Sequence, residues 1–409
     1  MTETVEEFRT RARAWLAANM PRIDFDNPPV GGRDEEGPWQ RARELQKRLY
    51  DGGFAGICFP REYGGLGLDI RYQKAFDAET DGYDMPLILN TPNFTICCAT
   101  ILDTGSEEQK RRHVGAALRG DEVLCQLLSE PSGGSDLAAV LTRADRRGDT
   151  WVINGAKTWS TSAFAADYGL CLARTDWDVP KHQGLTMFLL PIKAPGVTLR
   201  RIKQVNGSTE FCEEFFDNVE LDDDAVVGEV GDGWAVASRQ MYHERRSLGG
   251  GSEFSSGLGD EGPQVAPIDY VELAARTGQA DNERVREMAG RVMVHRAVAE
   301  QLADHVYHGV LDGSLPPAAG TIIRLFHADA HNLDVDTART IAGSAAVVGN
   351  DQDLLNIGVR YLSRQTVNLG GGSTEMARNV IAERVLNLPR EYAADRGVPF
   401  NQVRRNRER

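Results

Sequence analysis

The chain has 409 residues, of which 26% are charged, with a formal net charge of -14. This length can bury a large core in two or three domains. The acidic balance argues against a nucleic-acid-binding protein, which normally carries basic clusters that neutralise phosphates. Glu3, Glu6 and Glu7 precede any apolar stretch, which excludes the pattern of a signal peptide, and no apolar run reaches the length of a membrane span.

Cysteine and histidine spacing indicates neither a disulfide framework nor a metal centre. The six cysteines lack disulfide-framework or zinc-ribbon spacing, which is typical of a reducing compartment. We therefore expect a cytoplasmic protein. His327 and His331 are four residues apart on a predicted helix, but no third ligand accompanies them. We predict no metal site.

The first 120 residues have mainly helical periodicity. Apolar side chains recur at helical spacing over residues 6–18 and 39–49, which predicts two helices. A glycine-rich loop at 63–67 precedes another helical tract that runs through 78–79. Ser106 and Gln109 have the spacing of a capping box, so we expect a helix to begin there.

The pattern changes near Leu124. Up to about Val226 the apolar residues form short runs bounded by turn residues, at 150–155, 168–172, 187–190, 197–199 and 213–216. This segment is predicted to be an all-β insert.

Helical periodicity returns at Trp234. A Gly- and Ser-rich interruption from 249 to 262 is interpreted as an exposed or partly mobile connection. Long amphipathic tracts then follow at 269–278 with 282–312, 319–344 and 352–367. A last helix is expected to start near Ser373 and to end before Pro389. Helices, then strands, then helices make an α+β fold with segregated elements.

Five sequence motifs follow one another along the chain. The two most specific are Leu127-Leu128-Ser129-Glu130-Pro131-Ser132-Gly133-Gly134-Ser135-Asp136 and the strand Asn154-Gly155-Ala156-Lys157-Thr158-Trp159-Ser160-Thr161. The others are at 59–67, 228–234 and 381–391. Together they span nearly the whole chain, and their order resembles that of the acyl-CoA dehydrogenase family, in which residues 127–136 match a flavin-contact signature. The resemblance implies an N-terminal helical domain (1–122), a central β-barrel-like domain (123–228) and a C-terminal four-helix bundle (229–409).

The resemblance also implies bound FAD. A flavin ring is flat and electron-poor; its polar edge needs fixed donors and its other side favours aromatic packing. Trp159 matches the position that packs on the flavin, and Ser129 and Thr161 match its hydroxyl partners. Ser135, in a turn where glycine permits close backbone approach, matches the position that binds the pyrophosphate or nearby substrate groups. The same signature contributes Leu127 and Gly134 as cofactor-binding positions.

The family oxidises acyl-CoA thioesters to trans-2-enoyl products, which requires a carboxylate base for the α-proton while hydride leaves the β-carbon for flavin N5. Most members place this glutamate where the present chain has Gly371. A minority carry it on a helix, before an arginine, and Glu244 with Arg245 matches that arrangement. We therefore predict Glu244 as the base. Glu375 is the competitor, interpreted as a helix-start charge. The backbone N–H of Gly371 remains available to polarise the thioester carbonyl.

The adenine half-site departs from the homotetrameric pattern. The matched tract has Thr340 where the family usually has Gln, shortly before Gly343, and no R-x-x-F-G motif occurs around 270–296. We assign Thr340 and Gly343 to the cofactor site. The pattern resembles that of dehydrogenases of steroid side chains, which are α2β2 heterotetramers. The expected partners are an acyl-CoA, an electron-transfer flavoprotein or similar acceptor, and either identical subunits or a second dehydrogenase-like chain.

Two alternative functions remain open at this point. One is a flavin monooxygenase on the same fold, which would use reduced flavin and oxygen, although a carboxylate at 244 favours dehydrogenation. The other is a non-catalytic subunit that completes the site of its partner.

Overall fold

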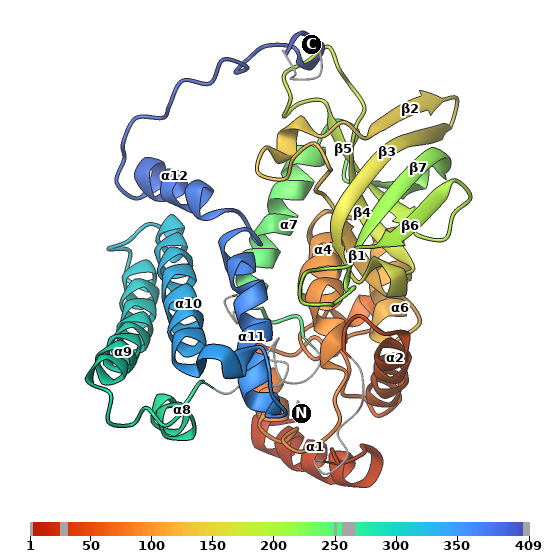
Figure 1. Cartoon of the computed structure of the whole chain (residues 1–409). Coiled ribbons are helices and arrows are strands. Elements are labelled where there is room, and N and C mark those ends of the chain that lie inside the picture. The colour runs from red at the N-terminus through yellow and green to blue at the C-terminus, as the bar shows by residue number, and fades with distance from the viewer. Residues whose placement is uncertain (1–2, 25–31, 249–251, 256–266, 404–409) are drawn as a thin grey trace. The chain divides into compact units, whose positions relative to one another are not determined.

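The computed structural model describes residues 3–24, 32–248, 252–255 and 267–403 (Figure 1). Most of the expected Gly- and Ser-rich connection at 249–262 lies outside these residues. The chain divides into two compact units. The first comprises Met1–Lys203, Ser208–Gln264 and Asp395–Arg409, and the second Gln204–Gly207 and Val265–Ala394.

The first unit begins with three helices, α1 (Val5–Asn19), α2 (Glu36–Asp51) and α3 (Ile70–Asp77). Phe8, Ala12 and Leu16 repeat every four residues on α1 and are fully buried. They pack into a cluster with apolar residues of α2 and α3. The predicted helical start of the chain is confirmed, because this spacing gives each helix one apolar face.

A second group of helices lies between 90 and 118. A helical segment, Asn90–Cys98, leads into α4 (Ala99–Thr104). After it, α5 (Glu107–Gln109) continues through Lys110–Val114 into α6 (Gly115–Leu118). The predicted capping box is confirmed: Gln109 N donates to Ser106 Oγ at 3.2 Å, and Ser106 N donates to Gln109 Oε1 at 3.0 Å.

The β insert forms one eight-stranded mixed sheet, as the short apolar runs predicted. Its strand order is β6-β7-β3-β2-β4-β5-β8, with β1 paired in parallel to β4. Apolar side chains from the strands pack together with those of neighbouring helices in the largest core cluster of the described residues. The strands are β1 (Leu124–Leu127), β2 (Arg143–Arg147), β3 (Thr150–Thr161), β4 (Tyr168–Arg174), β5 (Leu185–Pro191), β6 (Val197–Arg201), β7 (Phe211–Asp222) and β8 (Val226–Val227).

Helix α7 (Gly233–Leu248) follows the sheet and belongs to the first unit. It packs against β5, α4 and the segment Asn90–Cys98. At its start, a Cβ on Gly233 would lie 2.5 Å from the backbone N of Thr186 on β5, so only glycine allows this close approach. The N-terminal half of α7 is therefore held directly against the sheet.

The second unit is helical, as predicted. It contains α8 (Tyr270–Arg276), α9 (Glu283–Leu311), α10 (Gly320–Ala342), α11 (Gln352–Ser363) and α12 (Thr374–Arg384). Side-chain N-caps start four of these helices, at Asp269, Asn282, Asp351 and Ser373. The apolar faces of α8, α9, α10 and α11 meet in a shared core. The order of helices, sheet and helices makes the α+β class correct.

Residues 395–403 return to the first unit, which no pattern in the sequence predicted. Phe400 is 2% exposed, and its ring centroid lies 3.6 Å from the guanidinium carbon of Arg174. Phe400 N donates to Val179 O, and Lys181 bridges Asp395 and Asp136 at 2.6 and 2.9 Å. Arg174 also donates to the carbonyls of Ala138 and Val140. The returning segment thus braces the loop that follows the flavin-contact signature.

We expect Phe400→Ala to destabilise the first unit by about 3 kcal/mol, since it removes a buried ring and one face of the Arg174 contact. Hydrogen exchange should accelerate at 136–142 and 175–183, while β3 stays protected. Phe400→Leu is the matched control and should lose much less, because it keeps apolar volume. Unchanged exchange at 136–142 in the alanine variant would contradict the bracing role.

Candidate active site

The two most specific motifs are joined by a buried ion pair. Lys157 of β3 is fully buried and donates to the Glu130 carboxylate at 2.9 Å and to Leu128 O at 3.0 Å. Glu130 also accepts from the backbone N of Leu141 and Thr142, at 2.6 and 2.8 Å. Burial acts to raise the pKa of Glu130, but the Lys157 charge and these hydrogen bonds outweigh it and lower the pKa. The charged residues of both motifs therefore have a structural role.

Trp159, two residues after Lys157, combines an unusual backbone conformation with an exposed side chain. It has φ 63°, in the left-handed region that non-glycine residues rarely adopt, at a β-bulge where the β3–β7 register shifts between Thr158 and Ser160. The indole is 57% exposed, and it meets the Phe211 ring edge-on, with ring centroids 5.8 Å apart. Strain that holds a large aromatic side chain out of the core is typical of a ligand-contacting position.

The turn of the flavin-contact signature lies beside the same strand. Thr158 N of β3 donates to Ser129 O at 2.9 Å, so Ser129 is fixed next to the bulge. A Cβ on Gly134 would lie 3.2 Å from Ser129 Oγ, which shows how closely the glycine backbone passes over that hydroxyl. Ser135 is exposed. Ser129, Gly134 and Trp159 are thus brought together by backbone contacts.

Two other predicted cofactor residues differ in what they can offer. Leu127 is fully buried at the end of β1, paired with Cys171 of β4, so its side chain belongs to the core. Any contribution from Leu127 to a cofactor has to come from its backbone. Thr161 is half-buried at the end of β3, two residues beyond Trp159, and pairs with Phe211.

Glu244 lies in the last two turns of α7 and is half-buried. Its carboxylate Oε2 accepts a hydrogen bond from Gln126 Nε2 of β1 at 3.2 Å. Gln126 comes three residues before Ser129. The predicted base is therefore joined by one side-chain contact to the strand that leads into the flavin-contact signature. Arg245 is exposed on the same helix.

Contacts on both sides of Glu244 fix the helix. His243 Nε2 lies 2.7 Å from Asp103 Oδ2 of α4, and Arg239 forms an ion pair with the same carboxylate. Burial lowers the pKa of His243. One turn further on, the Ser247 hydroxyl lies 2.9 and 2.8 Å from those of Thr91 and Thr95. Residues 243 and 247 thus anchor α7 to two other elements and restrict its rotation.

The remaining predicted residues lie in the second unit. Gly371 is exposed, with φ 67°, in the turn before α12. Glu375 is exposed in the first turn of α12, as expected for a helix-start charge. Thr340 is exposed on α10 and its hydroxyl donates to Asp336 O at 2.7 Å, while Gly343 ends that helix with φ 59°.

Two residues near the site, Gln126 and Glu214, were not predicted from the sequence. A glutamine in a strand carries no motif, although its place three residues before Ser129 could have drawn attention to it. Glu214 could have been found because a carboxylate interrupts the apolar run of β7. Glu214 is fully buried and accepts from Ser160 Oγ at 2.8 Å, and its Oε1 has no hydrogen-bond partner among the residues that the structure describes. Burial foremost raises its pKa to about 8, against the opposing effects of the Ser160 hydrogen bond and the Lys157 charge.

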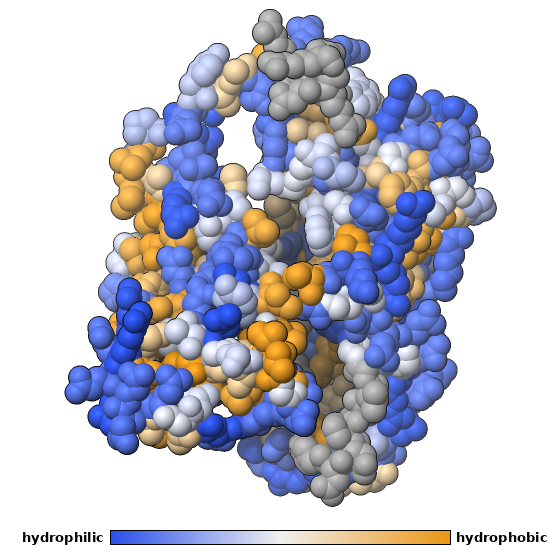
Figure 2. All heavy atoms as spheres, in the orientation of Figure 1, coloured by the Kyte–Doolittle hydropathy of each residue, from blue (hydrophilic) through white to orange (hydrophobic). Residues whose placement is uncertain are grey.

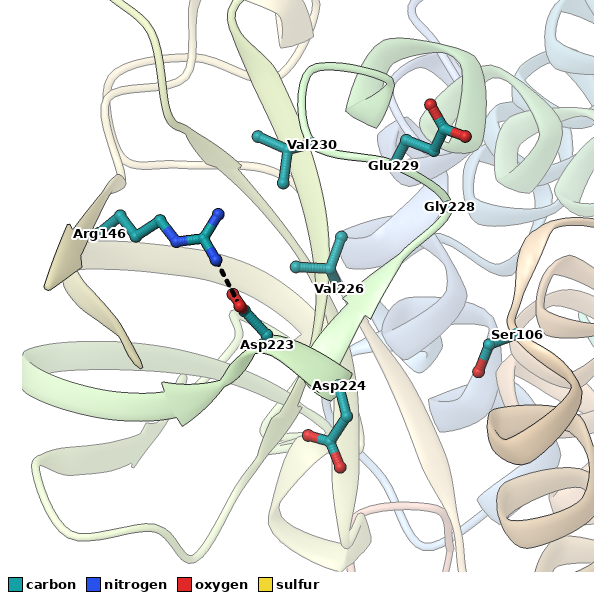
Figure 3. A pocket seen from close by; sticks show the side chains of 8 residues that line it. All are labelled: Ser106, Arg146, Asp223, Asp224, Val226, Gly228, Glu229 and Val230. Carbon is teal, nitrogen blue, oxygen red and sulfur yellow. Dashed lines mark hydrogen bonds and ion pairs between the residues drawn. The ribbon is translucent and has the colours of Figure 1, made fainter. Parts of the chain in front are cut away.

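A shallow surface hollow lies elsewhere, around the motif at 228–234 (Figure 3). Its polar lining is mostly acidic, from Asp223, Asp224 and Glu229, and Arg146 is paired with Asp223. No predicted cofactor or base residue lines it. An acidic lining repels phosphates, so this hollow does not suit a nucleotide cofactor.

Neither a metal cluster nor a membrane span was found in the part of the chain that the structure describes. No group of three or more His, Cys, Asp or Glu side chains is placed to hold a metal ion there. No helix there is both long and apolar enough to cross a membrane.

Family models identify the chain. The N-terminal, middle and C-terminal domains of acyl-CoA dehydrogenase match residues 2–121, 125–219 and 231–386. The chain therefore belongs to the acyl-CoA dehydrogenase family, a class of flavin-dependent oxidoreductases. The resemblance and the α+β fold class inferred from sequence are confirmed.

Individual members of the family are similar to the chain over nearly its whole length. The chain is 34% identical over 395 residues to acyl-CoA dehydrogenase IpdE1 of Mycobacterium tuberculosis, covering 95% of this chain and 99% of the relative. Among solved structures, the Tcur3481-Tcur3483 steroid ACAD superposes with a TM-score of 0.71 at 27% identity, covering 96% and 100% of the two chains. The ChsE4-ChsE5 complex of M. tuberculosis, with a TM-score of 0.65, 22% identity and coverage of 96% and 99%, shares the fold.

The buried carboxyl of Glu214 predicts a pH dependence of stability. Because its folded-state pKa is raised, the stability it contributes is complete below the unfolded value near 4.5 and is lost as the pH rises through about 8. Glu214→Gln has no charge to bury, so its free energy of unfolding should exceed that of the wild type by a margin that grows with pH and levels off above 8.

Urea unfolding at several pH values between 4.5 and 9 measures this margin. Glu213→Gln is the matched control, since Glu213 is the neighbouring carboxylate on the opposite face of β7 and is half-buried. A pH-independent difference between Glu214→Gln and the wild type would show that Glu214 is ionised in the folded state.

Proposed function

We propose that the chain catalyses the FAD-dependent α,β-dehydrogenation of an acyl-CoA thioester to the trans-2-enoyl-CoA, with Glu244 as the base. The observation that carries this proposal is the hydrogen bond between Glu244 and Gln126. It links a carboxylate on α7 to β1, three residues before Ser129 of the flavin-contact signature. A base for this reaction has to act beside the flavin ring, and this connection supports that geometry.

The residues around the β3 bulge fit a flavin. The exposed indole of Trp159 offers a flat apolar surface, and Ser129 and Thr161 offer hydroxyl groups for a polar ring edge. Gly134 and Ser135 form an exposed turn in which backbone groups can approach a pyrophosphate closely. The positive φ of Trp159 supports this assignment, because a tryptophan that only packs in a core gains nothing from such a strained conformation. Bound FAD supplies the hydride acceptor, N5.

Glu244 supplies the proton acceptor. The reaction needs a carboxylate held over the substrate α-carbon and shielded from water, and Glu244 is half-buried on a helix fixed at residues 243 and 247. Gly371 has no side chain that could take a proton, and we assign its backbone N–H to the thioester carbonyl. Arg245 completes the proposed catalytic set.

We expect Glu244→Gln to lower the rate of flavin reduction by acyl-CoA at least about a hundredfold, because an amide cannot accept the α-proton. Flavin content should stay unchanged. Anaerobic stopped-flow bleaching of the flavin absorbance measures the rate. Glu375→Gln is the matched control and should reduce flavin at the wild-type rate.

Three other outcomes would decide among the alternatives. If the Glu244→Gln variant keeps full activity when it is assayed without a partner chain, the base is another residue. An unaffected rate in an assembled complex would favour a non-catalytic role for this chain. Absence of flavin reduction by any acyl-CoA, combined with oxygen-dependent product formation from reduced flavin, would favour a monooxygenase.

We propose further that the chain assembles with a second dehydrogenase-like chain, which completes the adenine half of the FAD site, and that electrons pass to an electron-transfer flavoprotein or similar acceptor. Thr340 supports the proposed partner chain. Its hydroxyl donates its proton to the Asp336 carbonyl, so the same proton is not available to the adenine. Helix α9 supports it as well, because it exposes large apolar side chains, including Met293, Val294 and Leu311 at 60–66%. Figure 2 shows such hydrophobic residues among polar ones on the surface of the second unit. Two structural relatives, the Tcur3481-Tcur3483 steroid ACAD and the ChsE4-ChsE5 complex, are each named after two different chains.

The chain purified alone should contain substoichiometric FAD, and co-expression with its partner should restore full occupancy. Flavin absorbance per protein and light-scattering mass measure both. Val294→Glu on α9 should weaken assembly, while Val271→Glu on α8, equally apolar and 78% exposed, serves as the control. A homotetramer with one FAD per chain would exclude the need for a different partner.

A further inference from the structure

Gln126 is held on a rigid platform. It occupies the third position of β1, opposite Leu170 of β4 in the parallel register. Its neighbours Cys125 and Leu127 are buried, while Gln126 itself is half-buried and turned toward α7. The Leu124 backbone N donates to Asn93 Oδ1 at 3.0 Å, which ties the start of β1 to the segment Asn90–Cys98. The backbone that carries Gln126 is therefore fixed on both sides.

We propose that Gln126 is a positioning residue for Glu244: its amide N–H fixes the orientation of the carboxylate and favours its ionised form. The inference deepens the proposed function and rests on it for the catalytic role, but the contact itself stands on the 3.2 Å hydrogen bond. To accept the α-proton, Glu244 has to be ionised before the substrate binds, and its carboxylate has to be held in one orientation.

A hydrogen-bond donor beside Glu244 affects the ionisation of its carboxylate. A neutral N–H that binds a carboxylate favours the charged form, whereas burial without a donor favours the neutral acid. The segment Asn90–Cys98 faces Glu244 with Cys97, a fully buried thiol whose pKa is raised by burial and in part by the Glu244 charge. This neutral thiol adds no positive charge beside the carboxylate.

Several charged groups also lie on or beside α7. Asp103 of α4 is engaged by Arg239 and His243, and Arg245 and Arg246 follow Glu244 on its own helix. β5 faces α7 near Thr186, which is not ionisable. The Gln126 amide is thus a donor that can act on Glu244 without adding a charge, and a neutral donor keeps the carboxylate basic enough to accept a proton.

We expect Gln126→Leu to move the acidic limb of the kcat/KM profile to higher pH by about one unit, because the carboxylate loses a hydrogen-bond donor. Gln126→Glu should move it further, since two carboxylates repel. Gln126→Asn, which keeps the amide on a shorter side chain, should fall between Leu and the wild type. Gln240→Leu is the matched control: it removes a buried glutamine of α7, one turn before Glu244, whose side chain has no hydrogen-bond partner in the described structure.

A second measurement separates this inference from the proposed function. The loss of unfolding free energy in Gln126→Leu should be larger at pH 8, where Glu244 is ionised, than at pH 4, and this difference should vanish in a Glu244→Gln background. A wild type that dehydrogenates acyl-CoA while Gln126→Leu keeps the same acidic limb would overturn the inference alone. A wild type that never reduces its flavin would overturn the proposed function, and the stability cycle would still test the contact.

Discussion

The ion pair between Glu130 and Lys157 is the interaction on which the geometry of the site depends. Two buried charges cost several kcal/mol of desolvation each unless their hydrogen bonds are satisfied. Here the Glu130 carboxylate also binds two backbone amides, and the Lys157 ammonium also binds the Leu128 carbonyl. The pair therefore fixes the backbone immediately before Ser129 and immediately before Trp159. A hydrophobic replacement could fill the same volume, but it would not tie these two backbone segments together.

The strain at Trp159 follows from that anchoring. Lys157 has to point into the core, and a regular strand would then place residue 159 on the same buried face. The bulge between Thr158 and Ser160 breaks the alternation, so Ser160 turns inward to Glu214 while the indole turns outward. The left-handed conformation costs on the order of 1–3 kcal/mol, which the surrounding sheet offsets. The exposed indole and the buried polar network are thus two results of one irregularity.

Much of this architecture could be predicted from sequence, because periodicity and caps are local signals. The apolar repeat of α1, the Ser106 capping box and the strands between 124 and 226 all depend on neighbouring residues. The missing parts depend on residues far apart in the chain. Phe400 packs on Arg174 from more than two hundred residues away, and Gln126 meets Glu244 across 118 residues. No local sequence pattern encodes such pairs. Of these residues, only Glu244 could be identified from the sequence, because it matches a family motif.

The proposed place of the base in the chain has a structural consequence. A carboxylate at 371 would belong to the second compact unit, so its distance from Ser129 would depend on how that unit is held. Glu244 belongs to the same unit as Ser129 and Trp159, and its hydrogen bond to Gln126 joins it to β1, the strand that leads to Ser129. Its helix is also fixed one residue before Glu244 and three residues after it. If Glu244 is the base, as we propose, the spacing between proton acceptor and flavin-contact signature is set by contacts inside one folded unit, and the proposed partner chain does not have to set it.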